Sequence, residues 1–274
     1  MKFLVTGGAG FIGTQLCKKL RELGDVYSID NYSTGSKNNH IDKVTYIEGS
    51  TYNIILPTVD IIYHLGEGAR VVPSFEKIEQ YHKSNINGTF NILQHCIKTG
   101  AKIIYSASSA PLSKNGTRES PYSYMKHYNT GLIERFSEWY DLKYAITYFY
   151  NVYGNPNKLP PYSSVVDVFR EKHARKESLP VVRPGTQLRS YIHVSDVVSG
   201  LISTINTLGN ESYHFGTYER YSVMDIVNMF ESEYTFIDER PGDRSKSAEP
   251  DLATCSKLKW SPSIYLPDWI ESVK

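Results

Sequence analysis

A tyrosine and a lysine four residues apart, Tyr122 and Lys126, are the first candidates for chemistry in this sequence. Residues i and i+4 of an α-helix lie on one face, so we expect the Lys126 ammonium beside the Tyr122 phenol. A nearby positive charge favours the phenolate, which makes Tyr122 a candidate general base near neutral pH. Tyr124 is the rival tyrosine, but it points to another side of the helix, and Tyr128 rather than a lysine follows it at i+4.

Serine hydroxyls are the second candidate group. Ser106, Ser108 and Ser109 stand at the end of the apolar segment 101–107, the expected strand before that helix. A hydroxyl there can hydrogen-bond a substrate hydroxyl or carbonyl that is held against Tyr122. This placement favours a catalytic role for the tyrosine and lysine, a pair whose spacing is common by chance in a chain with 22 tyrosines.

Glycines recur every third residue in the segment GGAGFIG, residues 7–13. Gly7 allows a tight turn after a strand, Gly10 lets the backbone approach a pyrophosphate, and Gly13 lets the next helix pack closely. Free N–H groups at the start of that helix attract phosphate. The following strand ends at Asp30, whose carboxylate can bind an adenosine ribose and repels a 2′-phosphate. The arrangement predicts NAD rather than NADP, and the alternative is a glycine-rich turn without a cofactor.

Alternating apolar and amphipathic segments must position these groups. The expected strands are 2–6, 25–30, 44–48, 59–64, 101–107 and 143–150, and the expected helices are 11–23, 76–99 and 122–140. This alternation is typical of an α/β fold with a Rossmann-type doubly wound parallel sheet. We expect an NAD-binding domain of residues 1–150 plus 189–209. A smaller discontinuous α/β lobe, residues 151–188 plus 210–274, would bind the substrate.

Composition excludes several classes of partner. The net charge is +1, so nothing favours nucleic acid or an anionic membrane, and an anionic substrate needs local arginines. The three cysteines are widely spaced, which predicts no zinc site, no disulfide framework and a reducing, cytoplasmic location. No apolar run approaches the ~18 residues of a membrane span.

Nine ordered motifs resemble one superfamily over nearly the whole chain. They are GGAGFIG (7–13), DNYSTG (30–35), IIYHL (61–65), ARVVPSF (69–75), NINGT (85–89), SPYSYMK (120–126), NVYG (151–154), QLRSYIHVSDV (187–197) and RPGD (240–243). The sequence thereby resembles the extended short-chain dehydrogenase/reductases, and among them the UDP-glucose 4-epimerase-like members of the NAD-dependent epimerase/dehydratase family. The resemblance implies an NAD-dependent isomerase that interconverts UDP-glucose and UDP-galactose by transient oxidation at C4. It also implies a homodimer formed through the helices within 76–99 and 122–140.

The resemblance further implies roles for individual residues. The cofactor-binding positions are Gly7, Gly10, Phe11, Ile12, Gly13, Asp30, Asn31, Ser36, Leu65, Asn85, Ser106, Tyr122 and Lys126. The catalytic positions are Ser108, Tyr122 and Lys126. The substrate-binding positions are Ser108, Ser109, Asn151, Val165, Arg189, Arg240 and Asp243. The two arginines suit a diphosphate because guanidinium groups bind it bidentately, and a surface ion pair is the alternative for each.

The sequence also departs from the family pattern. The loop after the fifth expected strand is short and lacks the usual Val-Tyr-Gly, which leaves open whether Ser108 or Ser109 is the catalytic hydroxyl. Glu67 replaces a small residue after the fourth strand. Because a buried carboxylate near cofactor phosphate is unfavourable, we expect it to point to solvent. Ser247, seven positions past Arg240, is small and compatible with N-acetyl sugars.

Other activities on this fold require different residues. A 4,6-dehydratase or a decarboxylase would carry an acid just after the catalytic hydroxyl, where Ser109 and Ala110 stand. A deoxysugar reductase would prefer NADPH, against Asp30. A non-catalytic NAD-binding regulator would lack the pair of Tyr122 and Lys126. The sequence leaves open which sugar and which base the substrate carries.

Overall fold

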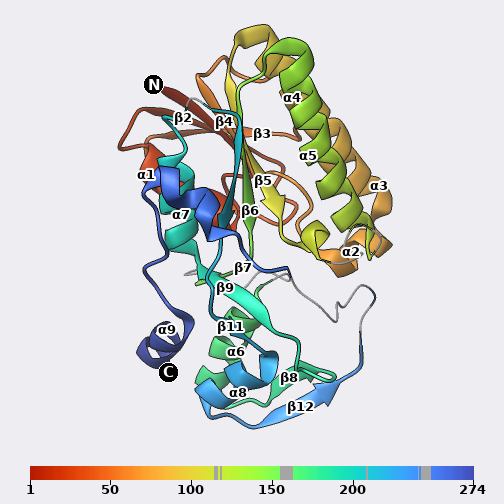
Figure 1. The fold of residues 1–274 in the computed structure, drawn as a ribbon, viewed down its shortest axis with the longest axis vertical. Helices are drawn as coiled ribbons and strands as arrows, with labels where there is room; N and C mark the ends of the chain where they lie inside the picture. The colour runs from red at the N-terminus through yellow and green to blue at the C-terminus, as the bar shows by residue number, and fades with distance from the viewer. Residues whose placement is uncertain (114–116, 118, 155–162, 208, 240, 242–247) are drawn as a thin grey trace.

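Seven strands form one parallel sheet, which dominates the computed structural model (Figure 1). The strands are β1 (Lys2–Thr6), β2 (Asp25–Asp30), β3 (Val44–Glu48), β4 (Ile61–His64), β5 (Lys102–Ser108), β6 (Tyr144–Phe149) and β10 (Glu211–Phe215). Their order is β10-β6-β5-β4-β1-β2-β3, and each pair of neighbours is parallel. Strands buried on both faces read as continuous apolar runs, as β4 does. The predicted doubly wound parallel sheet is confirmed.

The structure describes residues 1–113, 117, 119–154, 163–207, 209–239, 241 and 248–274. None of the helices within these ranges combines the length and hydropathy that crossing a membrane requires.

Helices cover both faces of the sheet. On one face lie α1 (Phe11–Leu20) and α7 (Val194–Ser203), and on the other lie α4 (Gly88–Thr99) and α5 (Pro121–Tyr140), as Figure 1 shows. Each pair closes its own apolar core, one around Leu16 and Leu201 and the other around Ile92 and Ile133. Local signals set the ends of these helices. Ser120 caps the start of α5 by accepting a hydrogen bond from the Ser123 N–H at 3.1 Å.

The helix expected over residues 76–99 is not one continuous α-helix. It consists of α2 (Val71–Glu76), α3 (Ile78–Tyr81), a π-helical segment η2 (His82–Asn87) and α4. The wider turns of η2 carry Asn85, whose backbone carbonyl accepts a hydrogen bond from the Asn129 side chain at 2.8 Å. Such π-helical turns occur often at functional sites, and this one ties the helix to α5 beside a predicted cofactor residue.

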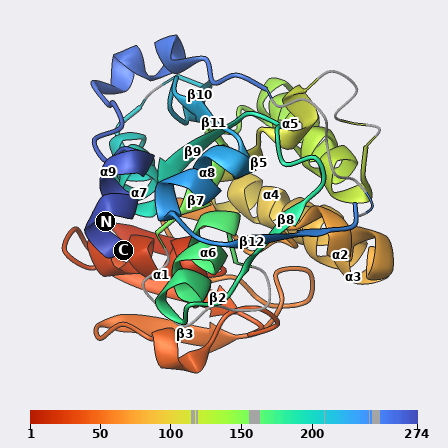
Figure 2. The ribbon, with the colours of Figure 1, turned by 90° about the horizontal axis from the view of Figure 1, so that it is seen from below.

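A smaller lobe lies beyond the carboxyl ends of the sheet strands, where β5 and β6 point (Figures 1 and 2). Its strands are β7 (Asn151–Tyr153), β8 (Leu179–Val182), β9 (Arg189–His193), β11 (Arg220–Tyr221) and β12 (Tyr234–Ile237). They form a three-stranded sheet, β11-β9-β7, and a two-stranded one, β12-β8. Its helices are α6 (Val165–Ala174), α8 (Val223–Phe230) and α9 (Leu266–Val273), which share an apolar core with these strands. A 3-10 segment, η5 (Leu252–Leu258), contacts β10.

Two strands belong to a different lobe from the one that we expected. Glu211–Phe215, which the sequence placed in the smaller lobe, is the edge strand β10 of the central sheet, paired with β6. Its alternating side chains Tyr213 and Phe215 are buried in the core under α1 and α7, which explains the placement. Arg189–His193, expected with the NAD-binding domain, pairs instead with β7 and β11.

Candidate active site

The glycine-rich turn between β1 and α1 has no room for side chains. Gly7 adopts φ +72°, and a Cβ there would stand 2.9 Å from the Cα of Gly66 in the loop after β4. At Gly13 a Cβ would stand 2.1 Å from the Gly7 carbonyl oxygen. Gly10 precedes α1 and gives its first N–H groups no side-chain cap, which suits a pyrophosphate. Phe11 and Ile12 begin the helix and pack against the core.

The carboxylate of Asp30 lies at the end of β2 beside this turn. Its Oδ2 accepts a hydrogen bond from the Ala9 N–H at 2.9 Å, and its Oδ1 accepts one from the Tyr32 N–H at 2.8 Å. Each oxygen keeps a lone pair for a ribose hydroxyl. Burial raises the pKa of Asp30, and these two backbone donors partly oppose that effect. The chemistry of these donors and acceptors fits the adenosine half of a dinucleotide.

Two further predicted cofactor residues border the same region. Asn31 donates from Nδ2 to Ser50 Oγ at 2.9 Å and so connects the ends of β2 and β3. Ser36 donates its backbone N–H to the Ala9 carbonyl at 3.2 Å and caps a short 3-10 turn, η1 (Lys37–Asn39). The structure therefore brings these residues together with Asp30 and the glycine-rich turn.

The residues expected at the nicotinamide half meet around the ends of β4 and β5. Asn85 is fully buried and hydrogen-bonds the backbone of Gly68 in both directions, at 2.7 and 3.0 Å. Ser106 Oγ donates to the His64 carbonyl at 2.8 Å, and Leu65 donates its N–H to Thr6 Oγ1 at 3.1 Å.

Tyr122 and Lys126 lie in the first turns of α5, with exposed fractions of 8% and 4%. The Tyr122 N–H donates to Ser74 Oγ at 3.2 Å, which fixes this end of α5 against α2. Tyr124 is 60% exposed, so only one of the two rival tyrosines is buried. The Lys126 Nζ donates to the Ser106 carbonyl at 2.5 Å. The predicted helix thus places the two side chains one turn apart on α5, and the Lys126 ammonium lies at the end of β5.

The two candidate hydroxyls differ in their surroundings. Ser108 is the last residue of β5, half-buried, and its Oγ accepts a hydrogen bond from the Ala110 N–H at 3.1 Å. Ser109 is buried, donates its N–H to the Phe149 carbonyl at 3.1 Å, and begins a 3-10 turn, η3 (Ala110–Leu112). Ser108 is therefore the more accessible of the two.

Glu67 was expected to point to solvent, and this prediction is wrong, because its side chain is only 1% exposed. The loop is held on both sides of it, by the close approach of Gly66 to the glycine-rich turn and by the bonds of Gly68 to Asn85. The carboxylate enters the interior and forms an ion pair with the Lys126 ammonium. Burial of a charge is tolerated where it is paired and hydrogen-bonded, as here.

Sequence reasoning missed the other members of this buried polar cluster, which are His64, Thr89, Tyr105 and Asn129. For two of them, the spacing in the sequence could have predicted a place in the cluster. Asn129 follows Lys126 at i+3, and Thr89 follows Asn85 at i+4, so each shares a helix face with a predicted residue.

Of the other predicted substrate residues, the structure describes three, and all three lie in the smaller lobe. Asn151 on β7 donates from Nδ2 to the Ser190 carbonyl at 2.8 Å, next to Arg189 on β9. Val165 begins α6 and packs against the core of the lobe. Arg240, Asp243 and Ser247 lie outside the described residues.

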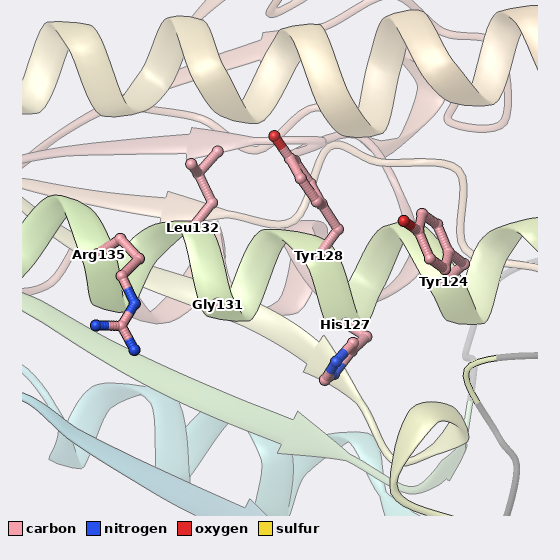
Figure 3. Close-up of a pocket in the computed structure, with 6 residues that line it drawn as sticks. All are labelled: Tyr124, His127, Tyr128, Gly131, Leu132 and Arg135. Atoms are coloured by element: carbon pink, nitrogen blue, oxygen red, sulfur yellow. The ribbon is translucent and has the colours of Figure 1, made fainter.

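A pocket of about 350 Å³ lies on the outer face of α5, away from this cluster (Figure 3). Its lining residues are Tyr124, His127, Tyr128, Gly131, Leu132 and Arg135. None of the six is a predicted cofactor or substrate residue, so the pocket is a feature of the helix surface rather than of the candidate active site.

Comparison with known proteins agrees with this geometry. A putative UDP-glucose 4-epimerase of Methanocaldococcus jannaschii is 29% identical over 98% of this chain and 96% of its own length. A UDP-glucuronic acid decarboxylase of Arabidopsis thaliana is also 29% identical, over 97% of this chain and 86% of its length. The crystal structure of a UDP-glucose 4-epimerase from Thermotoga maritima with UDP-glucose superposes with a TM-score of 0.91 at 29% identity, covering 100% of this chain and 97% of that one.

The family model for NAD dependent epimerases and dehydratases matches residues 3–216. That range contains the glycine-rich turn, Asp30, Asn85, and the buried pair of Tyr122 and Lys126. The chain belongs to the NAD dependent epimerase/dehydratase family.

Proposed function

We propose that this protein is a UDP-hexose 4-epimerase of the UDP-glucose/UDP-galactose type, which also accepts N-acetyl forms. The observation that carries the proposal is the burial of Tyr122 and Lys126 on α5, with the Lys126 ammonium bonded to Ser106 of the strand that ends at Ser108. Ser109 and Ala110 supply no acid after that hydroxyl. A dehydratase or decarboxylase needs an additional proton-transfer group at this place. The similarity to two UDP-glucose 4-epimerases supports the same reading.

The chemistry that NAD would supply here when bound is reversible hydride transfer at C4 of the sugar. Tyr122 as phenolate takes the proton of the 4-hydroxyl, so the C4 oxygen becomes a carbonyl as the C–H bond breaks. Ser108 donates a hydrogen bond to that oxygen while its charge changes. Tyr122 then returns the proton, and protons and hydride balance over the cycle.

The remaining roles divide between the two lobes. Asp30, Asn31 and the glycine-rich turn hold the adenosine and pyrophosphate, and Asn85 and Lys126 orient the nicotinamide half. Asn151 and Arg189 from the smaller lobe, together with Arg240 and Asp243, hold the nucleotide diphosphate of the substrate. A fixed diphosphate allows the keto sugar to turn over and present its other face.

The test is turnover of UDP-glucose by the purified protein with NAD, followed by NMR of the products. We expect UDP-galactose from the wild type and a loss of roughly 10²–10⁴-fold in rate for Tyr122→Phe, because the proton acceptor is removed. Tyr124→Phe is the matched control, since it deletes the same hydroxyl from an exposed tyrosine two residues away. Full activity of Tyr122→Phe would sink the mechanism.

The same assay separates the rival functions. Release of CO₂ from UDP-glucuronic acid would identify a decarboxylase, an outcome that the A. thaliana relative makes worth measuring. Tight binding of NAD without turnover of any UDP- or GDP-sugar would identify a regulator. Comparing the turnover rates of UDP-glucose and UDP-N-acetylglucosamine shows whether the protein accepts an N-acetyl group at C2 of the sugar.

We also propose that the protein is a homodimer in the cytoplasm. Apolar side chains remain exposed on α4 and α5, among them Phe90, Tyr128 and Trp139, and the pocket of Figure 3 lies on this surface. The three cysteines are free and buried, as is usual in a reducing compartment. Sedimentation should give a dimer that Tyr128→Lys weakens, and a monomeric wild type would contradict the dimer.

A further inference from the structure

The carboxylate of Glu67 is surrounded by donors from three different elements. Thr89 Oγ1 on α4 donates to Oε1 at 2.6 Å, Asn129 Nδ2 on α5 donates to Oε1 at 2.9 Å, and the Tyr105 hydroxyl on β5 donates to Oε2 at 3.1 Å. The Lys126 ammonium completes the shell. A carboxylate with this many partners has a fixed position and no free side towards a ligand.

The hydrogen atoms that each side chain carries determine which atom donates and which accepts in this cluster. Thr89 gives its only hydroxyl hydrogen to Glu67, so it must accept from His64 Nε2, 3.0 Å away. His64 Nδ1 is then the acceptor for Thr6 Oγ1 at 2.8 Å. Burial lowers the pKa of His64 to about 4, which agrees with this neutral, singly protonated ring. A directed chain therefore runs from β1 beside the glycine-rich turn to Glu67.

Lys126 is held by the same cluster. Its ammonium is fixed by the Glu67 carboxylate, by the Ser106 carbonyl at 2.5 Å, and by the ring of Tyr105, whose centroid lies 4.8 Å away. These contacts come from the β4 loop and from β5, so the protein itself sets the position of the ammonium. They also place a full negative charge next to the positive charge that follows Tyr122 by one turn of α5.

We propose that Glu67 is a positioning residue that holds Lys126 and reduces the effective positive charge which Tyr122 experiences. Tyr122 becomes a phenolate with the help of a neutral ion pair rather than of a lone ammonium. This inference rests on the proposed function only where it treats Tyr122 as the base of the reaction.

Other titratable groups also lie around Tyr122 and Lys126. Burial lowers the pKa of Arg70, while Tyr122, Tyr81 and Asp167 raise it, so Arg70 is a second cation that interacts with Tyr122. Burial raises the pKa of Tyr105 well above its usual value, so Tyr105 remains neutral in this range. The groups that interact with Tyr122 or Lys126 include His64, Glu67, Arg70 and Tyr105, and Tyr81 and Asp167 act on Arg70 in turn.

The test measures the ionisation of Tyr122 directly, by the ultraviolet absorbance of tyrosinate as pH rises. Subtracting the curve of the matching Tyr122→Phe protein isolates this tyrosine from the other 21 of the 22 in the chain. Glu67→Gln keeps the shape but removes the charge, and we expect the midpoint to fall by roughly one pH unit or more. Glu67→Asp keeps the charge, and Glu79→Gln removes an acid from an exposed pair with Lys83, so both should stay near the wild type.

A second variant keeps the proposal falsifiable if the buried single change prevents folding. The double variant Glu67→Gln/Lys126→Met replaces the ion pair by two neutral side chains, and its midpoint should lie within about half a unit of the wild type. A midpoint in Glu67→Gln that is unchanged or raised would overturn the proposal. A midpoint in the double variant that rises by a unit or more would also overturn it, because Lys126 alone would then set the ionisation of Tyr122.

The pH dependence of enzyme activity provides an independent test of the role of Glu67. The acidic limb of the pH–rate profile should move to lower pH in Glu67→Gln, whereas a purely structural role would lower the rate at every pH without moving the limb. If the wild type turns over no UDP-sugar, the proposed function fails while the titration still decides the role of Glu67.

Discussion

Asp30 and Glu67 are both buried carboxylates at the carboxyl ends of neighbouring regions of one parallel sheet, but their partners differ in kind. Asp30 accepts from two backbone N–H groups and keeps lone pairs for a ligand. Glu67 is saturated by side chains from α4, β5 and α5. The first arrangement fits the binding site that we propose, whereas the second organises the protein interior around a lysine. Burial alone therefore does not reveal whether an acid binds a ligand, and the partners have to be examined.

Among the changes that distinguish the two carboxylates, we expect Lys126→Met to have the largest effect. This change leaves Glu67 buried without its counter-charge, and we expect the free energy of unfolding to fall by about 3–5 kcal/mol. Urea denaturation measures it, with Lys83→Met in the exposed pair with Glu79 as control, expected to cost under about 1 kcal/mol. Adding Glu67→Gln to Lys126→Met should restore most of the loss, and equal effects in the two single variants would remove the distinction.

A smaller effect is expected from pH, through His64 in the cluster of Glu67. Its pKa is lowered to about 4 by burial, so the unfolded chain takes up a proton near pH 6.5 while the folded protein does not. Stability is therefore lost as pH falls from about 6.5 to about 4, by roughly 3 kcal/mol from this residue.

His64→Gln should flatten that part of the stability curve, measured by urea denaturation at several pH values. His82→Gln, at an exposed position of η2, serves as the control and should leave the slope unchanged. A slope for His64→Gln equal to that of the wild type would show that other groups carry the dependence.

The smallest effect concerns ligand affinity. Asp30→Asn should weaken the binding of ADP-ribose, which is the cofactor without its nicotinamide ring, by roughly tenfold to a hundredfold, because charged hydrogen bonds to the adenosine ribose are lost. Glu67→Gln should leave this affinity unchanged, since its oxygens are occupied by the protein. Calorimetry with both variants checks the contrast, and equal weakening would mean that Glu67 reaches the ligand as well.

The same comparison explains what the sequence could predict. Asp30 was predictable because its position depends on one strand, one turn and backbone donors, which are all local in sequence. Tyr122 and Lys126 were predictable for the same reason, through the period of a helix. Glu67 was predicted wrongly, because its partners lie on elements far apart in the chain. No local pattern brings Thr89, Tyr105 and Asn129 to one carboxylate.

The fold shows the same limit. The alternation of strands and helices predicted the parallel sheet and most of its strands, whereas the edge strand β10 was assigned to the wrong lobe. Its pairing with β6 joins residues 145 and 211 across the whole first part of the smaller lobe. A pattern confined to a short window of sequence carries no information about such a partner.

That edge strand also has a consequence for synthesis of the chain. Because β10 follows β9 and α7, a nascent chain that ends before residue 211 presents the open edge of β6, with unpaired N–H and C=O groups. Parallel pairing over such a separation forms slowly. In the interval between translation of β6 and arrival of β10, the growing protein thus exposes a strand edge that can pair with another chain.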